Sequence, residues 1–243
     1  MKYKTDLHTH TIVSGHAYTT LLENVKEAKK NGIEVLGATD HGPNMPGGPH
    51  IFYFGNREAV PQIIDGVIVL FGVEANIIDI NGKLDLEDEM LSRLDLVIAS
   101  LHNVCIKPGT AEENTKTVIN AMKNPYVDIL GHMGNPAFPL YYEEIVKEAK
   151  KQGKIVEINN SSYKSRIGST ENCLQIAKLC RKYRVPVSLS TDSHIAFTIG
   201  IFDKAEKIIK ESGIEENLII NMDKMRIINY LKNKGKIKDI VLE

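Results

Sequence analysis

Tryptophan is absent from the 243-residue sequence, and cysteine is scarce, with only Cys105, Cys173 and Cys180. Three is an odd number, and the cysteines lack the spacing of a thiolate metal motif. Each lies among apolar or helix-forming residues, where a reduced cysteine packs as a small apolar side chain. The sequence therefore argues against a disulfide framework, and we expect none of the three to act as a catalytic thiol.

The sequence also has no excess of either charge and no long apolar run. The sequence has 30 Lys and Arg against 31 Asp and Glu, which gives a formal net charge of −1. This balance argues against binding to nucleic acid or to a membrane through bulk electrostatics. No stretch approaches the roughly 18 apolar residues of a membrane span, and the start, MKYKTDLH, lacks the apolar segment of a signal peptide. We therefore expect a cytoplasmic protein.

Short apolar runs alternate with amphipathic segments along the chain. The expected strands are Tyr3–Asp6, Val35–Thr39, Val67–Val73, Leu96–Ser100, Val127–Leu130, Ile155–Ile158 and Val187–Leu189. Apolar residues recur three and four positions apart in the expected helices, which include Leu21–Gly32, Ala111–Asn124, Tyr141–Gly153 and Glu171–Arg184. This alternation predicts parallel strands joined by crossover helices, in one α/β domain over residues 1–243. The pair Asn81–Gly82 within Ile77–Leu86 predicts a small hairpin.

Histidine and acidic residues lie at the ends of these expected strands. The stretch DLHTHTIVSGH, residues 6–16, holds three of the eight histidines, His8, His10 and His16. Residues i and i+2 of an extended segment point the same way, so His8 and His10 would project on one side. The other strand ends hold His41, Glu74, His102, His132, Asp192 and His194. The carboxyl ends of parallel strands meet at one face, where α/β barrels build their active sites.

Such a cluster of histidines has no role in packing, because neighbouring imidazoles repel one another when they are charged. Neutral imidazole suits zinc, manganese or iron, and a carboxylate can bridge two ions. The sequence therefore predicts a metal centre. Asp6 and Asp40 lie close to these histidines and are candidates to fix an imidazole tautomer, although Asp40 is equally suited to capping a helix or turn.

The motifs at these strand ends resemble those of the PHP family, named for polymerase and histidinol phosphatase domains. The resemblance covers essentially the whole chain. It is carried by His102 and by the motifs DLHTHT (6–11), TDHG (39–42), GVEANI (72–77), GHMGNP (131–136) and STDSH (190–194). The stretches SGHAYTT, EINNSS and TDSHIAFTIG are similar in particular to the small single-domain phosphatases of the YcdX type.

The resemblance implies a distorted TIM-like (β/α)7 barrel with three divalent metal ions at the C-terminal ends of its strands. One ion would be held by His8, His10, Glu74 and Asp192. A second would be held by Glu74, as a bridge, with His102 and His132, and a third by His16, His41 and His194. Zinc is the ion expected first, with manganese or iron as alternatives. Catalysis would depend most on Asp192, Glu74 and His10.

The resemblance also implies the reaction, which is hydrolysis of a small-molecule phosphomonoester by a metal-bound hydroxide. Bound metal lowers the pKa of water toward about 7, so no serine or cysteine nucleophile is required. Arg57, Lys107 and Arg166 lie in loops after strand ends and are candidates to bind the substrate, as is Asn159. The alternative for the three basic residues is an ordinary surface charge, and for Asn159 it is a turn cap.

Three other functions stay open on the sequence. One is a histidinol-phosphate phosphatase, and another is an amidohydrolase-type C–N hydrolase, which also begins with a His-x-His pair in a barrel. The third is a non-enzymatic metal-binding domain. Structural metal sites tend to be closed and often use cysteine, whereas these ligands include no cysteine and lie at an open mouth. The small phosphorylated substrate is the expected partner, and a homo-oligomer is compatible with the sequence.

Overall fold

The computed structural model describes residues 2–237 of the chain. Its main sheet consists of seven parallel strands in the order β1, β2, β4, β5, β6, β7 and β8. The strands are β1 (Thr5–Thr9), β2 (Val35–Ala38), β4 (Val67–Asn76), β5 (Leu96–Ser100), β6 (Ile129–Leu130), β7 (Ile155–Asn159) and β8 (Val187–Ser190). The short strand β3 (Ile63–Ile64) pairs antiparallel with β4.

The sheet closes because the end of β8 meets the end of β1. The amide of Asp192 donates to the carbonyl of His8 at 2.9 Å, and the amide of His10 donates to the carbonyl of Ser193 at 2.8 Å. The prediction of a distorted (β/α)7 barrel is therefore confirmed. The closure also brings the residues that follow the first strand against those that follow the last one.

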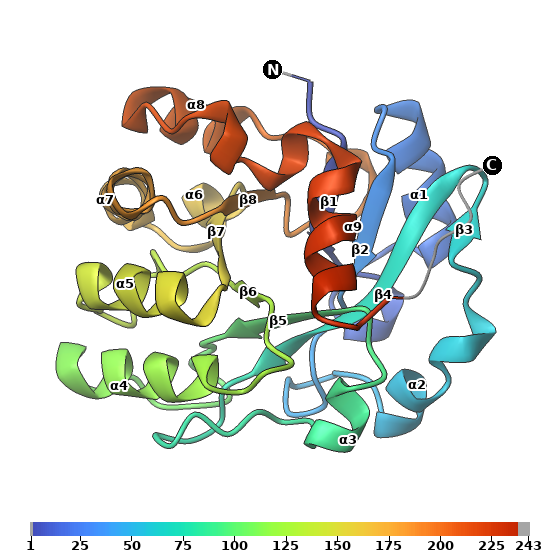
Figure 1. Cartoon of the computed structure of the whole chain (residues 1–243). Coiled ribbons are helices and arrows are strands. Elements are labelled where there is room, and N and C mark those ends of the chain that lie inside the picture. Colours follow the sequence, from blue (N-terminus) through green and yellow to red (C-terminus); the bar gives the residue numbers. More distant parts are fainter. Residues whose placement is uncertain (1, 238–243) are drawn as a thin grey trace.

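Helices surround the strands. They are α1 (Leu21–Lys30), α2 (Ile51–Gly55), α3 (Asp88–Leu91), α4 (Ala111–Met122), α5 (Tyr142–Gln152), α6 (Ser162–Ser165), α7 (Ser169–Tyr183), α8 (Asp203–Ser212) and α9 (Lys224–Asn233). Figure 1 shows α4, α5, α7 and α8 following one another along one side, with α1 on the other and α9 in front of the strands. Among residues 2–237 we find no helix with the length and apolar character that crossing a membrane requires.

The expected elements agree with the structure except at a few boundaries. Strand β1 runs from Thr5 to Thr9 and not from Tyr3 to Asp6, so His8 lies inside the strand. The hairpin expected at Ile77–Leu86 is reduced to a single antiparallel bridge between Ile77 and Leu84, closed by Gly82 with a φ of 80°. Strand β3 and five helices were not among the expected elements, namely the short α2, α3 and α6 and the longer α8 and α9.

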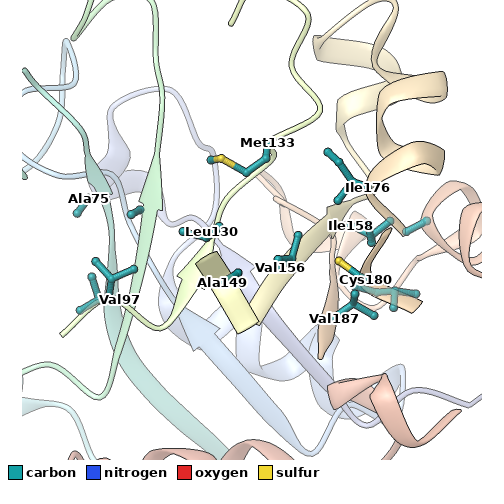
Figure 2. Close-up of a cluster of buried hydrophobic side chains, with 14 of the residues drawn as sticks. Ala75, Val97, Leu130, Met133, Ala149, Val156, Ile158, Ile176, Cys180 and Val187 are labelled. Atoms are coloured by element: carbon teal, nitrogen blue, oxygen red, sulfur yellow. The ribbon is translucent and has the colours of Figure 1, made fainter. Parts of the chain in front are cut away.

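Apolar side chains fill two layers, because alternate residues of each strand point to opposite faces of the barrel wall. The outer layer packs strands against helices, and Figure 2 shows part of it, where Val156 and Ile158 of β7 face Ile176 and Cys180 of α7. The inner layer fills the barrel with side chains from most of the strands, among them Leu7, Val35, Leu70, Ile98, Ile129 and Ile155. The same inner cluster contains Ile227, Ile228 and Leu231, so α9 closes the amino-terminal end of the barrel.

One buried asparagine joins the two edge strands where backbone pairing between them is missing. The Asn221 side chain accepts a hydrogen bond from the amide of Leu189 at 2.7 Å. Its amide group donates to the carbonyl of Thr5 at 2.8 Å and to that of Leu189 at 2.7 Å. A single side chain thus satisfies backbone groups that an eighth strand would otherwise pair.

We predict that Asn221→Ala lowers the free energy of unfolding by roughly 2–4 kcal/mol, because it removes three hydrogen bonds to buried backbone groups, one to the amide of Leu189 and two to the carbonyls of Thr5 and Leu189. Urea unfolding followed by circular dichroism measures this change. The matched control is Asn120→Ala, which removes two exposed hydrogen bonds, one to the carbonyl of Ile80 and one from Lys123, and should cost about 0.5 kcal/mol or less. If both variants lowered the free energy of unfolding by the same amount, the junction between β1 and β8 would not depend on Asn221.

Candidate metal centre

Side chains of metal-ligand type meet at the carboxyl-terminal mouth of the barrel. Two of them, His8 and Glu74, point inward from within β1 and β4, and the others lie in the connections that follow the strands. The nine residues expected as ligands all lie in this cluster, which comprises His8, His10, His16, His41, Glu74, His102, His132, Asp192 and His194. Most of these side chains are buried, whereas His16 is exposed.

The first group consists of His8, His10, Glu74 and Asp192. The Nε2 atoms of His8 and His10 lie 3.1 Å apart. Oδ1 of Asp192 is 3.2 Å from Nε2 of His10, and Oε2 of Glu74 is 3.3 Å from Nε2 of His8. In a tetrahedral zinc site with Zn–N distances of about 2.0–2.1 Å, neighbouring ligand atoms are roughly 3.3 Å apart. The spacing in this group is therefore that of ligands around one ion.

The second group consists of Glu74, His102 and His132, and it uses the other oxygen of the same carboxylate. Oε1 of Glu74 lies 2.7 Å from Nε2 of His132 and 3.2 Å from Nε2 of His102. Glu74 thus faces the first group with Oε2 and the second with Oε1. This is the arrangement that a bridging carboxylate requires.

The third group consists of His16, His41 and His194. Nε2 of His16 lies 3.3 Å from Nε2 of His41 and 3.0 Å from Nε2 of His194. His41 also approaches the other groups, since its Nδ1 is 2.7 Å from Oε2 of Glu74. The imidazole of His41 therefore stands between the buried ligands and the more exposed ones.

The hydrogen bonds around the first group place the imidazole protons of His8 and His10 on Nδ1, so that their Nε2 atoms have none to donate. Ser14 donates to Asp40 at 2.6 Å, so its oxygen serves as the acceptor for Nδ1–H of His10, 3.1 Å away. Nδ1 of His8 faces a carboxylate in the same way, at 2.7 Å from Glu157. The Nε2 atoms of both rings then carry lone pairs, and they face each other and a carboxylate. A cation between these atoms is the chemistry that fits such a donor set.

Unpartnered buried atoms in the cluster point to the same conclusion. Among the described residues, buried polar atoms without a hydrogen-bond partner include Oε2 of Glu74, Nδ1 of His41 and Nε2 of His102. Leaving a buried polar atom unpaired costs about 1–3 kcal/mol, and native structures rarely gather such atoms. Oε2 of Glu74 and Nε2 of His102 are the atoms through which these two residues would bind an ion, whereas Nδ1 of His41 lies on the side of its ring that faces Glu74. The residues present therefore fit a metal centre.

The electrostatics of the cluster favour positive charge at its centre. Burial alone would raise the pKa of Glu74, but the imidazoles of His102, His8 and His41 hold that pKa well below its usual value. Burial alone would lower the pKa of His8, but Glu157, Glu74 and Asp192 hold it well above its usual value. Carboxylates are thus kept ionised around a position that a proton or a metal ion can occupy.

Two of the ligand residues have left-handed backbone conformations that are uncommon outside glycine. The φ angle is 35° for His132 and 52° for Asp192. Such conformations cost of order 1–3 kcal/mol and persist only where surrounding contacts enforce them. The strain at these residues lies in the metal centre itself, where the direction of each side chain matters most.

A cavity of about 400 Å³ opens onto the ligands. Its lining includes all three side chains of the third group, Asp192 and His102, and the basic residue Arg166. Nη1 of Arg166 donates to Oδ2 of Asp192 at 3.2 Å, and to the hydroxyls of Ser165 and Ser162 at 3.3 and 3.4 Å. The guanidinium is therefore held at the wall of the cavity, beside a ligand of the first group.

The other residues expected to contact substrate lie elsewhere or are occupied. Arg57 forms an ion pair with Asp95 at 2.8 Å and lines a separate cavity at the amino-terminal end of β5. Lys107 is exposed and is not among the side chains that line the cavity at the ligands. Asn159 is buried, and its amide group donates to Asp192 and Glu157 at 3.1 Å each. Of the four candidates, only Arg166 lies at the cavity.

Two supporting residues were missed in the sequence. Nδ1 of His102 lies 2.7 Å from the side-chain oxygen of Asn76, at the end of β4. Glu157 in β7 contacts His8 and the backbone of His132. The sequence-based prediction for the stretch EINNSS used Asn159 and overlooked the acidic residue at its start, Glu157. A single charge within an apolar strand, IVEIN, was the available signal for a residue that points into the mouth.

Asp6 and Asp40 only partly follow their expected roles. Asp6 accepts hydrogen bonds from Thr191 and Gly200 and from no imidazole within residues 2–237, so the expectation that it fixes a histidine tautomer is wrong. Asp40 acts on His10 through the hydroxyl of Ser14. Because it also accepts from the amide of Thr11 at 2.7 Å, it fixes the turn as well.

The cysteines are free, as expected. Cys173 and Cys180 are buried on α7, facing the core, and burial raises the pKa of Cys173 to about 11. Cys105 lies near the mouth, where burial together with Asp85 and Glu74 raises its pKa to about 11. The thiolate form that a nucleophile needs is thus disfavoured at both.

Comparison with known proteins gives matches over the entire chain. A family model described as the PHP domain matches residues 6–161. A protein of Clostridium botulinum named a probable phosphatase is 56% identical over 243 residues, with all of each chain covered. A probable phosphatase of Clostridium novyi is 54% identical over 244 residues, again with all of each chain covered.

Among solved structures, the fold is similar to that of a histidinol phosphate phosphatase from Lactococcus lactis, crystallised with zinc, L-histidinol and phosphate. The TM-score is 0.65 at 20% identity, and the match covers 88% of this chain and 95% of that one. At this identity the likeness concerns the fold.

We predict that Glu74→Gln removes more than one metal ion per chain, because the substitution keeps the size of the side chain but removes the charge shared by two groups of ligands. Elemental analysis of protein purified without chelator measures the loss. His16→Ala should remove about one ion, since His16 belongs to the third group alone.

Glu112→Gln, on the exposed first turn of α4, is the control and should retain the metal content of the unmodified protein. Retention of all metal in Glu74→Gln, with loss in His102→Ala, would contradict the bridging role.

Proposed function

The chain belongs to the PHP domain family, and from this premise we propose that it is a phosphatase that hydrolyses a small-molecule phosphomonoester with metal ions held at the barrel mouth. The observation that carries the proposal is the cluster of opposed ligand atoms beside a cavity with a basic wall. The names of the Clostridium relatives, at more than half identity over the full length, support phosphatase activity over C–N hydrolysis. The full-length matches also support a single domain over residues 1–243.

The proposal assigns one divalent ion to each of the three groups, with Glu74 shared between the first and the second. Zinc is the first expectation and manganese or iron are alternatives, because imidazole nitrogens outnumber carboxylates among the ligands. When bound, such ions acidify a coordinated water and neutralise the charge of a phosphoryl group. His10, Glu74 and Asp192 matter most among the ligands, since Glu74 joins two groups and Asp192 links the first group to Arg166.

Asp192 has a separate role for each of its oxygens. Oδ1 faces Nε2 of His10, whereas Oδ2 accepts hydrogen bonds from Asn159 and Arg166. The two donors orient the carboxylate, so that Oδ1 points at the position of the ion. Arg166 in turn is held by that carboxylate and by two serine hydroxyls. Metal binding and the placement of the guanidinium therefore support each other.

Arg166 is the residue that we assign to the substrate phosphate. Within residues 2–237 the hydrogen bonds of its side chain all use Nη1, which leaves Nη2 and Nε to donate to phosphoryl oxygens. Hydrogen bonds between guanidinium and phosphate are charge-assisted and fix orientation as well as affinity. The cavity of about 400 Å³ has the size of a small-molecule site, and the net charge of −1 does not favour nucleic acid as the substrate.

We infer a direct displacement by water, because neither Ser14 nor Cys105 is suited to act as a nucleophile. Ser14 donates to Asp40, and its oxygen accepts from His10, so the hydroxyl is committed on both sides. The pKa of Cys105 is raised to about 11, so its thiol stays protonated at neutral pH. The reaction then breaks the bond between phosphorus and the ester oxygen without a phosphoenzyme.

The first test concerns Arg166. We predict that Arg166→Ala raises KM for an aryl phosphate by about 10- to 100-fold, the equivalent of one charged hydrogen bond. Arg57→Ala is the matched control and should leave KM unchanged, because Arg57 pairs with Asp95 away from the ligands. Metal content is measured in both variants, since Arg166 also contacts Asp192. An unchanged KM in Arg166→Ala would remove this residue from the site.

The second test concerns the reaction. Activity toward an aryl phosphate should vanish after treatment with a chelator and return when zinc, manganese or iron is added back. With a substrate that is chiral at phosphorus and isotopically labelled water, one direct displacement inverts the configuration. Retention would instead reveal a phosphoenzyme, and activity that survives complete removal of metal would overturn the metal-dependent mechanism.

A further inference from the structure

Glu157 is a buried carboxylate that the proposed ligand set does not use. We propose that it is a positioning residue that controls the affinity of two of the three ions, those of the first and second groups, and leaves the third unaffected. The inference rests on the proposed function in that it assumes ions at these groups. It concerns how one residue outside the ligand set holds ligands of two different ions.

Both oxygens of Glu157 are committed to ligand-bearing residues. Oε1 lies 2.7 Å from Nδ1 of His8, in the first group. Oε2 accepts from the backbone amide of His132, in the second group, at 2.7 Å. Oε2 also accepts from the side chain of Asn159 at 3.1 Å, and Asn159 donates onward to Asp192. Glu157 is only 2% exposed, so water does not compete for these bonds.

The contact with His8 fixes the chemistry of the ring. A carboxylate at Nδ1 selects the tautomer with a proton on Nδ1, which turns the lone pair of Nε2 toward His10. The negative charge also makes Nε2 a stronger donor toward a cation. Loss of such a carboxylate costs 10- to 100-fold in metal affinity in other metal sites.

The contact with His132 acts through the backbone. The φ angle of His132 is 35°, in the left-handed region that is unfavourable for a residue with a Cβ atom. The hydrogen bond from its amide to Glu157 ties this turn to β7. The same conformation aims Nε2 of His132 at Glu74, 2.7 Å away. Glu157 thus holds a ligand of the second group in place without touching its ring.

The third group stands apart from this arrangement. Within residues 2–237, no hydrogen bond joins Glu157 to a member of that group. Nδ1 of His194 instead lies 3.0 Å from the backbone carbonyl of Asp192. The geometry therefore predicts a selective effect, in which two ions weaken and one does not.

The experiment uses the variant Glu157→Gln and measures cobalt(II) binding by calorimetry and by the visible absorption of the bound ion. The substitution replaces one carboxylate oxygen by the NH2 group of an amide, which donates and does not accept, so the side chain can no longer accept from His8 and from the amide of His132 together. We expect two ions to bind about 10- to 100-fold more weakly and the third to change by less than about threefold. The Nδ1–H proton resonance of His8 should shift or disappear.

Asp95→Asn is the matched control. Asp95 is likewise buried and likewise accepts from one backbone amide, that of Phe71, and it also accepts from the side chain of Arg57, but it lies at the other end of the barrel. It should lose thermal stability and keep the cobalt affinities of the unmodified protein. Glu157→Asp, which keeps the charge but shortens the reach, serves as a second variant and should also weaken two ions.

Unchanged affinities in both Glu157 variants, or equal weakening of all bound ions, would overturn the assignment. Failure of the proposed function has a different signature. If the unmodified protein binds fewer than three ions, the proposal of a three-ion centre is wrong. The role of Glu157 is then tested by the affinities of the ions that do bind. If metal binds as proposed but no phosphomonoester is hydrolysed, the phosphatase proposal fails and the binding measurements remain decisive for Glu157.

Discussion

The buried negative charge of Glu74 is the interaction on which the rest of the mouth depends. The carboxylate is 1% exposed, and imidazole nitrogens of five histidines lie between 2.7 and 3.5 Å from its oxygens. Burying a charge is costly unless it is paired, and the imidazoles of His8, His10 and His102 already use their other nitrogen in contacts with Glu157, Ser14 and Asn76. A cation at this position would balance the charge of Glu74 together with those of Asp192 and Glu157, which lie around the same imidazoles.

Three of the imidazoles are held in place by residues that contact Nδ1, the ring nitrogen opposite the one that faces the cluster. Nδ1 of His8 contacts Glu157, that of His10 contacts Ser14, and that of His102 contacts Asn76. The rings are thus oriented by the protein before they meet an ion, and their Nε2 atoms converge. Such preorganisation is what a metal centre needs in order to bind at fixed geometry. The third group, together with His102 and Asp192, lines the cavity beside Arg166 and is therefore open to a small molecule that enters it.

The barrel and the meeting of nine metal-ligand-type residues at its mouth could largely be predicted from the sequence, because both follow from local patterns. Strand periodicity places the strands, and the residues at their carboxyl ends must share one face. The supporting contacts could not be predicted in this way. Glu157 reaches His8 from 149 positions away, and only the closed barrel brings them together. Arg57 and Arg166 both follow strand ends in the sequence, and nothing in the sequence distinguishes them. In the structure, the loop of Arg57 places it in an ion pair with Asp95, whereas the loop of Arg166 places it at the cavity, beside Asp192.

The closure of the barrel between its first and last strands has a consequence for the order in which the proposed centre can form during synthesis. A chain that emerges from its amino terminus delivers Glu74, His102 and His132 before β8. The first group is complete only with Asp192 and the third only with His194, although their earliest members are among the first residues made. An ion held by His8 and Asp192 together would link the first strand to the segment that follows the last one, so the first group is complete only when the barrel has closed.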